Sequence, residues 1–270
     1  MESKDRARGD APGCAMETRD LHFSYTEGIP VLRGVSLGIK AKKVTTLLGA
    51  NACGKTTLLR LLAKDLTPSA GSVLLGGTDI RSIKRRDFAR RAAIVHQKNA
   101  APDDLTVRKL VSYGRLPHGS MFRTGSAENA APVENAMERA GLLALADTPI
   151  GTLSGGQRQR AFIAMALAQD TEILFLDEPT TFLDVRYQIE ILRLLRELNE
   201  RHGVTVVMVL HDINQAILYS DEIIGLRDGK ALVGGAPREA VNADSIRLLY
   251  GIELDVREDA KSGIRWVLPV

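Results

Sequence analysis

Two short segments of the sequence have the residue types and spacing that hold phosphate groups. Residues 49–57 read GANACGKTT, which fits the phosphate-loop pattern G-x-x-x-x-G-K-[ST]. In such a loop, backbone N–H groups surround phosphate oxygens, the Lys55 ammonium adds positive charge and the Thr56 hydroxyl can bind Mg²⁺. Residues 153–160 read LSGGQRQR, where two glycines behind a serine open an apolar, helical run that would also suit an anion. The chain therefore carries two candidate phosphate-binding segments.

Two adjacent acids follow the short apolar run ILFL at 173–176. Open α/β sheets bind their ligands at the carboxyl ends of the strands, which is where Asp177 and Glu178 would lie. Asp177 suits the coordination shell of Mg²⁺, and Glu178 could accept the proton of an attacking water. Two acids in a solvated turn would look the same in isolation, but beside a phosphate loop they indicate hydrolysis of a nucleoside triphosphate.

Three more polar side chains end predicted strands. His211 ends the apolar run VTVVMVLHD, and Gln97 ends AAIVHQ, so both are expected at the same sheet edge as the acids. Gln97 could contact the metal and its water there, although a polar strand terminus is the alternative. Tyr25 follows the first predicted strand and could stack on a base, but a half-exposed hairpin tyrosine would have the same pattern.

Composition limits the class of protein. The chain has 270 residues, 44% of them hydrophobic, so it can bury a large core. Its net charge of +3 is small for this length and does not favour nucleic-acid binding. The longest apolar stretches fall short of the roughly 18–20 residues that cross a bilayer, and residues 1–13 lack the apolar core of a signal peptide. Cys14 and Cys53 are expected to be free thiols.

The hydrophobic pattern predicts an α/β fold. Alternating residues over 20–40 predict an antiparallel hairpin, and VTTLLG at 44–49 followed by TTLLRLLAK predicts strand, phosphate loop and helix. The apolar runs at 173–178 and 204–212 read as parallel strands buried on both faces, joined by an amphipathic helix. That helix carries one apolar stripe, formed by Ile191, Leu194, Leu195 and Leu198.

Strand signals are absent between about 98 and 165, where 106–115 and 133–145 read as helices separated by a Gly/Pro/Ser-bearing linker. We therefore expect a helical subdomain inserted into the α/β core. Residues 1–15 read as a disordered tail, 16–258 as the domain and 259–270 as a tail with a possible final strand. The basic segment RSIKRRDFARR at 81–91 reads as a solvated short helix, or alternatively as a contact for acidic lipids or an acidic partner.

The order of GANACGKTT, AAIVHQ, LSGGQRQR, ILFLDEPTTFLD and VLHD resembles that of the ATP-binding-cassette (ABC) ATPases, over roughly residues 16–258. The resemblance implies a P-loop NTPase core with a mixed sheet, an N-terminal antiparallel β-subdomain and a helical insertion. It also implies ATP and Mg²⁺ as cofactors and a homodimer in which the LSGGQ of one copy covers the ATP of the other. That arrangement explains why one chain carries two phosphate-binding segments.

The resemblance assigns roles to individual residues. The residues implied for the chain's own ATP are Tyr25, Gly49, Asn51, Cys53, Gly54, Lys55, Thr56 and Thr57. The residues implied for the partner's ATP or for communication across the dimer are Ser154, Gly155, Gly156, Gln157 and Asp184. Glu178, His211 and Gln97 would serve hydrolysis, while Thr56, Gln97 and Asp177 would hold Mg²⁺. Ala50 and Ala52 depart from the proline and glycine usual in this loop, and we expect a negative φ at Ala52 because alanine tolerates positive φ poorly.

Further segments, including TVRKLVSYGRLPHG and the ending GGAPREAVNADSIRLLYGIELDV, look like ATPases of bacterial importers for iron-siderophores, haem or cobalamin. This implies two membrane permeases as partners, indirectly a substrate-binding protein, and a peripheral position on the cytoplasmic face of the bacterial inner membrane. The alternatives are a non-transport cassette ATPase acting on ribosomes or DNA, and a nucleotide-binding regulator without turnover. The former would be expected to show tandem cassettes or long coiled coils, and the latter would not need Glu178 and His211.

Overall fold

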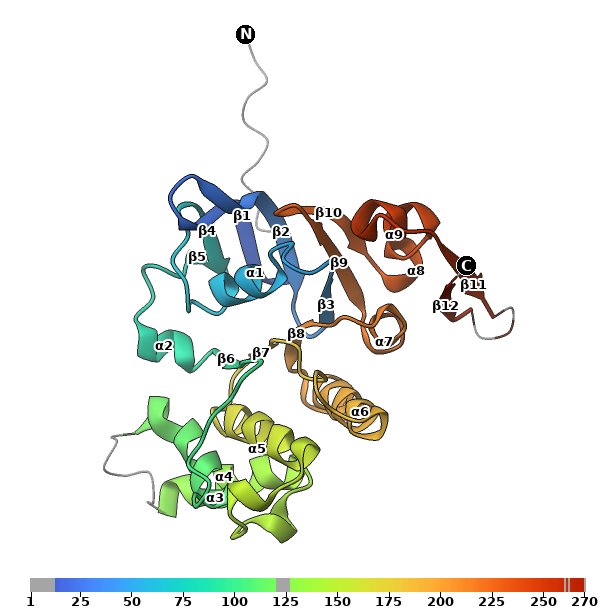
Figure 1. Cartoon of the computed structure of the whole chain (residues 1–270). Coiled ribbons are helices and arrows are strands. Elements are labelled where there is room, and N and C mark those ends of the chain that lie inside the picture. The colour runs from blue at the N-terminus through green and yellow to red at the C-terminus, as the bar shows by residue number, and fades with distance from the viewer. Residues whose placement is uncertain (1–12, 120–126, 260, 262, 270) are drawn as a thin grey trace.

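Two β-sheets enclose helix α1 (Lys55–Leu62) in the computed structural model of the chain, which describes residues 13–119, 127–259, 261 and 263–269 (Figure 1). The first sheet is antiparallel, with strand order β2-β1-β4-β5. Its strands are β1 (Cys14–Thr26), β2 (Ile29–Lys40), β4 (Ala70–Leu75) and β5 (Thr78–Asp79). The predicted hairpin is confirmed, but β1 begins earlier than expected: Cys14 pairs with Lys40, so residues 14 and 15 belong to the sheet and not to a tail. Residues 1–12 of that predicted tail lie outside the described residues.

The second sheet has six strands in the order β10-β9-β3-β8-β7-β6. Five of them run parallel and β10 pairs antiparallel with β9. The strands are β3 (Val44–Leu48), β6 (Ala92–Val95), β7 (Ile173–Leu176), β8 (Thr205–Val209), β9 (Glu222–Arg227) and β10 (Lys230–Gly235). Every residue of β3, β7 and β8 is buried, as the continuous apolar runs predict for strands covered on both faces.

Side-chain alternation divides the core into two clusters. Ile173 and Phe175 of β7 pack with α1 and the antiparallel sheet, whereas Leu174 and Leu176 pack with the helices on the other face. Those helices include α6 (Val185–His202), whose four predicted stripe residues are all buried. Gly203, with φ of 65°, ends this helix in the left-handed conformation. The predicted α/β fold is confirmed.

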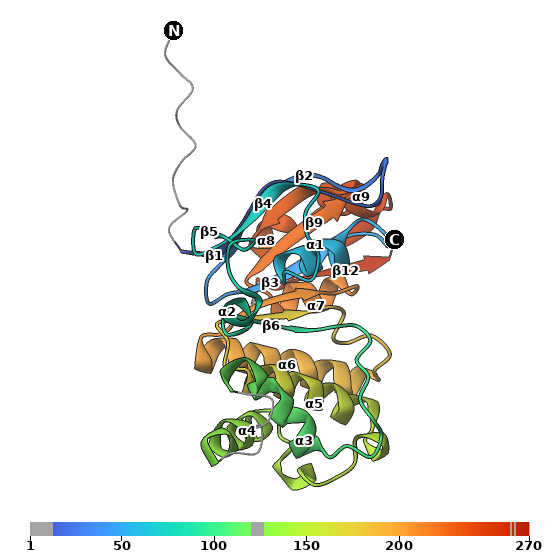
Figure 2. The ribbon, with the colours of Figure 1, turned by 90° about the vertical axis from the view of Figure 1, so that its left-hand side faces the viewer.

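The chain between β6 and β7 forms a helical layer below the sheet (Figure 2). It contains α3 (Val107–Ser112), the 3₁₀ helix Tyr113–His118, α4 (Ala127–Arg139), two short 3₁₀ helices (Leu143–Leu145 and Ile150–Thr152) and α5 (Gly155–Ala168). The helix predicted over 133–145 is displaced: α4 starts before Pro132, which it accommodates, and stops at Arg139 because Gly141 adopts a φ of 66°. Residues 120–126 of the predicted linker lie outside the described part of the chain.

The basic segment contains a short helix, α2 (Arg85–Ala89), as predicted. Arg86 and Arg90 each donate a hydrogen bond from Nε to the Pro117 carbonyl, at 2.8 and 2.9 Å, so this helix is joined to the helical insertion. Beyond β8 the chain forms α7 (Ile213–Tyr219), α8 (Pro237–Ala240), α9 (Ala243–Tyr250), β11 (Leu254–Glu258) and β12 (Arg265–Pro269). The final strand expected in 259–270 is therefore β12, which pairs with β11.

Both cysteines are free thiols, as expected from the sequence. Within the described residues, none of the helices combines the length and the apolarity that crossing a membrane requires.

Candidate functional site

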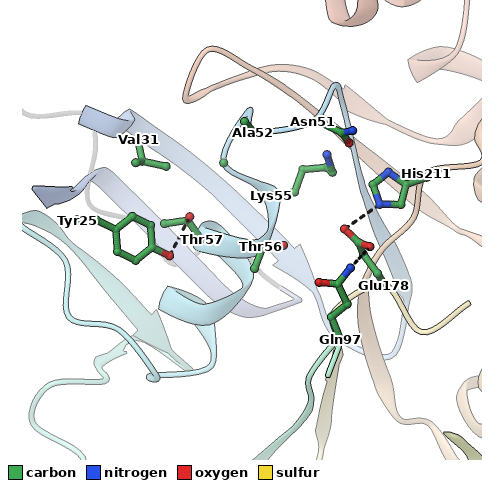
Figure 3. Close-up of a pocket in the computed structure, with 11 residues that line it drawn as sticks. Tyr25, Val31, Asn51, Ala52, Lys55, Thr56, Thr57, Gln97, Glu178 and His211 are labelled. Atoms are coloured by element: carbon green, nitrogen blue, oxygen red, sulfur yellow. Dashed lines mark hydrogen bonds and ion pairs between the residues drawn. The ribbon is translucent and has the colours of Figure 1, made fainter. Parts of the chain in front are cut away.

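A cavity of about 550 Å³ lies beside the N-terminus of α1, at the carboxyl ends of β3, β6, β7 and β8 (Figure 3). It is lined by Tyr25, Val31, Asn51, Ala52, Gly54, Lys55, Thr56, Thr57, Gln97, Glu178 and His211. Nine of these eleven residues are sequence-predicted site residues, contributed by segments up to 186 positions apart in the sequence. Val31 was missed, because an apolar residue in a β-strand carries no chemical signal. The tertiary structure therefore assembles most of the predicted site in one place.

The phosphate loop between β3 and α1 is held by left-handed backbone at three positions. Gly49 has φ of 142°, Ala52 of 61° and Gly54 of 106°. The negative φ expected at Ala52 is therefore wrong. The fixed ends of the loop leave no alternative there: Cys53 N–H donates to the Ala50 carbonyl at 3.4 Å, and the loop must reverse direction to begin α1. Alanine accepts this conformation at a cost of about 1–2 kcal/mol relative to the right-handed region.

Lys55 is the first residue of α1, and its side chain is only 5% exposed. Its Nζ donates to the carbonyl oxygens of Gly49 at 2.9 Å and Ala50 at 2.8 Å, so the ammonium lies under the loop. The first turn of α1 contains no acidic side chain. A helix N-terminus, a buried cation and a loop rich in backbone N–H groups together favour an anion in this cavity.

Asp177 lies behind the cavity wall, where its Oδ1 accepts a hydrogen bond from Thr56 Oγ1 at 2.8 Å. Burial raises the pKa of this carboxyl above its usual value, and the hydrogen bond from Thr56 opposes that effect. A buried carboxylate next to a hydroxyl benefits from a cation that replaces its lost solvation. No cluster of three or more metal-binding side chains occurs in the described residues, so the donor set fits Mg²⁺, which takes one or two protein ligands together with substrate phosphates.

Glu178 is surrounded by hydrogen-bond donors. Its Oε2 accepts from Gln97 Nε2 at 2.5 Å and from Thr181 Oγ1 at 3.0 Å, and its Oε1 lies 2.7 Å from His211 Nε2 (Figure 3). Glu178 itself has a φ of 52°, a strained conformation for a residue of this type. The three predicted hydrolytic residues thus form one network, and Thr181 is a fourth member that the sequence analysis missed.

Tyr25 occupies the other end of the cavity, at the end of β1. Its ring is 57% exposed, packs edge-on against Phe23 with centroids 4.8 Å apart, and its hydroxyl lies 3.3 Å from Thr57 Oγ1. These contacts fix the orientation of the ring and leave most of its surface accessible. A flat ligand group such as a base could stack there.

The LSGGQ segment lies elsewhere. Ser154 is the N-cap of α5 and forms a capping box with Gln157: Ser154 N–H donates to Gln157 Oε1 at 2.9 Å, and Gln157 N–H donates to Ser154 Oγ at 3.3 Å. Gly155 is exposed, whereas a Cβ on Gly156 would lie 2.4 Å from Tyr187 Cδ1. Asp184, the N-cap of α6, is also exposed. Ser154, Gly155, Gly156, Gln157 and Asp184 do not line the cavity of their own chain.

Two contacts from the C-terminal part support the phosphate loop from behind, and the sequence analysis found neither. Gly49 N–H donates to the Tyr250 hydroxyl at 3.1 Å, and Gly229 N–H donates to the Cys53 carbonyl at 3.2 Å. Burial raises the pKa of the Tyr250 phenol to about 12. A Cβ on Gly49 would lie 2.1 Å from the Leu226 carbonyl oxygen, so this position requires glycine. Gly49 and Cys53 are therefore loop-shaping positions that face away from the cavity.

Comparison with known proteins agrees with this geometry. Residues 32–181 match the family described as ABC transporter. The chain is 44% identical over 240 residues to a ferric enterobactin transport ATP-binding protein of Escherichia coli K12, covering 89% of each chain. It is 40% identical over 248 residues to an iron(3+)-hydroxamate import ATP-binding protein of Bacillus subtilis 168, covering 92% of each.

Among solved structures, a dimeric post-hydrolysis ATP-binding cassette bound to ADP and Pi has 29% sequence identity and a TM-score of 0.71, covering 82% of this chain and 98% of that one. The family match spans more than half of the chain, and it includes both the phosphate loop and the Asp177–Glu178 pair. The relatives extend the similarity over about nine-tenths of the sequence. The phosphate loop, the polar network at the strand ends and these similarities lead to one conclusion: the chain belongs to the ABC transporter family.

Proposed function

We propose that this protein is the ATP-hydrolysing subunit of a bacterial importer for iron-siderophore complexes, with haem or cobalamin as related cargo classes. The observation that carries the ATPase assignment is the cavity in which the Lys55 loop faces the Glu178 network. The cargo assignment is supported by relatives whose names refer to ferric enterobactin and iron(3+)-hydroxamate.

ATP would lie along the cavity from Tyr25 to His211. The Tyr25 ring would stack on adenine, and the phosphates would be held at the N-terminus of α1 by the loop and by Lys55. The residues proposed to bind or shape this site are Tyr25, Gly49, Asn51, Cys53, Gly54, Lys55, Thr56 and Thr57. Mg²⁺ would be held by Thr56 and Asp177, with Gln97 at its edge, and when bound it would neutralise charge on the phosphates.

Glu178 would accept the proton of the attacking water, because its carboxylate is the base directed into the cavity beside the phosphate loop. In the present arrangement, Gln97 and His211 both contact that carboxylate. We propose that ATP draws these two side chains toward the γ-phosphate, so that Glu178 becomes free to bind water. Thr181 would keep the carboxylate oriented throughout.

Ser154, Gly155, Gly156, Gln157 and Asp184 lie outside their own cavity, and we propose that they complete the cavity of a second copy. Two copies related by a twofold axis would then bury two ATP molecules between them. Closing and reopening of this dimer would move two membrane permeases bound at the cytoplasmic face of the inner membrane. The permeases in turn would receive cargo from a separate substrate-binding protein.

The decisive test compares Mg²⁺-dependent ATP hydrolysis and oligomeric state in three proteins: the unmodified chain, Glu178→Gln and Lys55→Ala. We expect Glu178→Gln to bind ATP, lose turnover and form a stable dimer, because the base is removed while the binding surfaces remain. We expect Lys55→Ala to lose ATP binding or turnover and to stay monomeric. A Glu178→Gln protein that remains monomeric at saturating ATP and Mg²⁺ would contradict the shared site, and unchanged hydrolysis by Lys55→Ala would contradict the phosphate-loop assignment.

The transport assignment needs a separate measurement. We expect a tagged chain isolated from detergent-solubilised membranes of its own organism to carry a polytopic permease, identified by mass spectrometry. Recovery of ribosomes or nucleoprotein without a permease would leave the ATPase chemistry intact and favour the non-transport alternative.

A further inference from the structure

The loop between β7 and α6 exposes two large apolar side chains to solvent. Phe182 is 87% exposed and Val185 is 69% exposed, the two highest values among large hydrophobic residues in the described part of the chain. Single exposed apolar residues are common on protein surfaces, but two within four positions form a local patch. We call Phe182 and Val185 the apolar loop pair.

The backbone holds Phe182 in this exposed position. Its φ of 64° is in the left-handed region, which is rare for a bulky side chain. The turn is fixed by Thr181 N–H to the Glu178 carbonyl at 3.2 Å and by Gln188 Nε2 to the Leu183 carbonyl at 2.9 Å. Leu183, the next residue, turns inward and packs against the core. The fold therefore maintains both backbone strain and apolar exposure at Phe182, a combination that points to a contact outside the chain.

The apolar loop pair lies between the two halves of the proposed shared site. The loop starts at Glu178, whose carboxylate lines the nucleotide cavity. At its other end, Leu183 Cδ2 lies only 3.4 Å from the position of a Cβ on Gly155, in the LSGGQ segment. Asp184, the exposed N-cap of α6, separates Phe182 from Val185 in the chain. A second copy that covers the cavity with its LSGGQ segment must therefore pass close to this pair.

We propose that Phe182 and Val185 form an apolar contact with a second copy of this chain, and that this contact provides much of the stability of the ATP-bound dimer. The proposal rests on the shared-site dimer of the proposed function and adds to it the residues that hold the two copies together. In a twofold-symmetric dimer every contact occurs twice, so each substitution acts at two places. Removal of the Phe182 ring from a buried contact is worth about 10-fold in an equilibrium constant at each place, and thus about 100-fold for the dimer.

The test measures the dimer dissociation constant by analytical ultracentrifugation at saturating ATP and Mg²⁺, in the Glu178→Gln background that prevents turnover. Phe182→Ala keeps a Cβ, so the backbone strain is unchanged and only the ring is lost. Phe182→Leu is the conservative variant that retains apolar surface. Leu248→Ala is the matched control, because Leu248 on α9 is also exposed, at 44%, but lies in a different part of the fold. ATP binding to each protein is measured separately at concentrations where it is monomeric.

We expect Phe182→Ala to weaken dimerisation by about 100-fold with ATP affinity unchanged, and Phe182→Leu and Leu248→Ala to remain within about fivefold of the parent. Equal dimerisation of Phe182→Ala and the parent would overturn the proposal and would favour a permease as the partner of this loop. Parallel loss of ATP binding in Phe182→Ala would also overturn it, because the effect would then arise inside one copy. Absence of a dimer in the parent itself would instead contradict the proposed function.

Discussion

The phenol of Tyr250 offers a sharp test of how the phosphate loop is held. Gly49 is buried, and its N–H donates to the Tyr250 hydroxyl at 3.1 Å. Tyr250→Phe keeps the ring in the core but removes the acceptor. Because the Gly49 N–H would then be buried without a partner, we expect the free energy of unfolding to fall by about 1–3 kcal/mol. Water entering the gap would reduce this loss toward the lower limit.

The pH dependence of the same variant gives a second, independent prediction. Burial raises the pKa of Tyr250 from 10.0 to about 12, so the folded protein keeps the phenol proton to higher pH than the unfolded chain does. The stability that this provides is complete below pH 10 and is lost as the pH rises through about 12. At pH 11 the loss is roughly 1.4 kcal/mol, and it affects only the protein that has the phenol. The stability difference between the two proteins should therefore shrink by about that amount between pH 8 and pH 11.

Urea denaturation, followed by circular dichroism at pH 8 and pH 11, measures both quantities. Tyr113→Phe is a suitable control, since Tyr113 is partly exposed in the helical insertion and far from the loop in the fold. A Tyr250→Phe protein within 0.5 kcal/mol of the unmodified chain at pH 8, with no narrowing at pH 11, would refute the reasoning. In that case Gly49 would have to be held by its neighbours alone.

Two glycine-related substitutions test other backbone features by urea denaturation. Ala52→Gly should raise the free energy of unfolding by about 0.5–1 kcal/mol, because glycine adopts a φ of 61° without the penalty that alanine carries, less the extra freedom of glycine in the unfolded chain; a decrease would contradict the strain argument. Gly156→Ala should lower it by about 1–3 kcal/mol, because the new Cβ would lie 2.4 Å from Tyr187 Cδ1. Gly155→Ala is the matched control, since a Cβ there meets Leu183 Cδ2 at an ordinary 3.4 Å, and equal losses in both variants would rule out the steric explanation.

Much of the fold and site could be predicted from the sequence because the signals are local. A parallel strand buried on both faces needs consecutive apolar residues, so ILFL and VTVVMV identified β7 and β8. The stripe from Ile191 to Leu198 identified α6 in the same way. The phosphate loop was recognised because glycine, lysine and threonine must occur at fixed spacing to surround a phosphate. Helix α4 was located less well, because Pro132 reads as a boundary while the chain packs it inside a helix.

Other features depend on residues that are distant in sequence, and only the tertiary structure determined them. The sequence could suggest Gln97, Glu178 and His211 separately, but their hydrogen-bonded network exists because β6, β7 and β8 are neighbours in one sheet. The positive φ of Ala52 results from closure of the loop between two fixed elements, which overrides the local preference of alanine.

The support of the phosphate loop and the exposure of its surroundings show the same division. Tyr250 reaches Gly49 across 201 positions, and neither residue type indicates that contact. Phe182 and Leu183 are adjacent apolar residues, yet one lies in solvent and the other in the core because the turn after Glu178 directs them apart. The sequence by itself determined the chemistry and the succession of elements, since these follow from residue type and period. The tertiary structure decided which side chains meet, which backbone strain is tolerated and which surface stays open, because those depend on the packing of the whole chain.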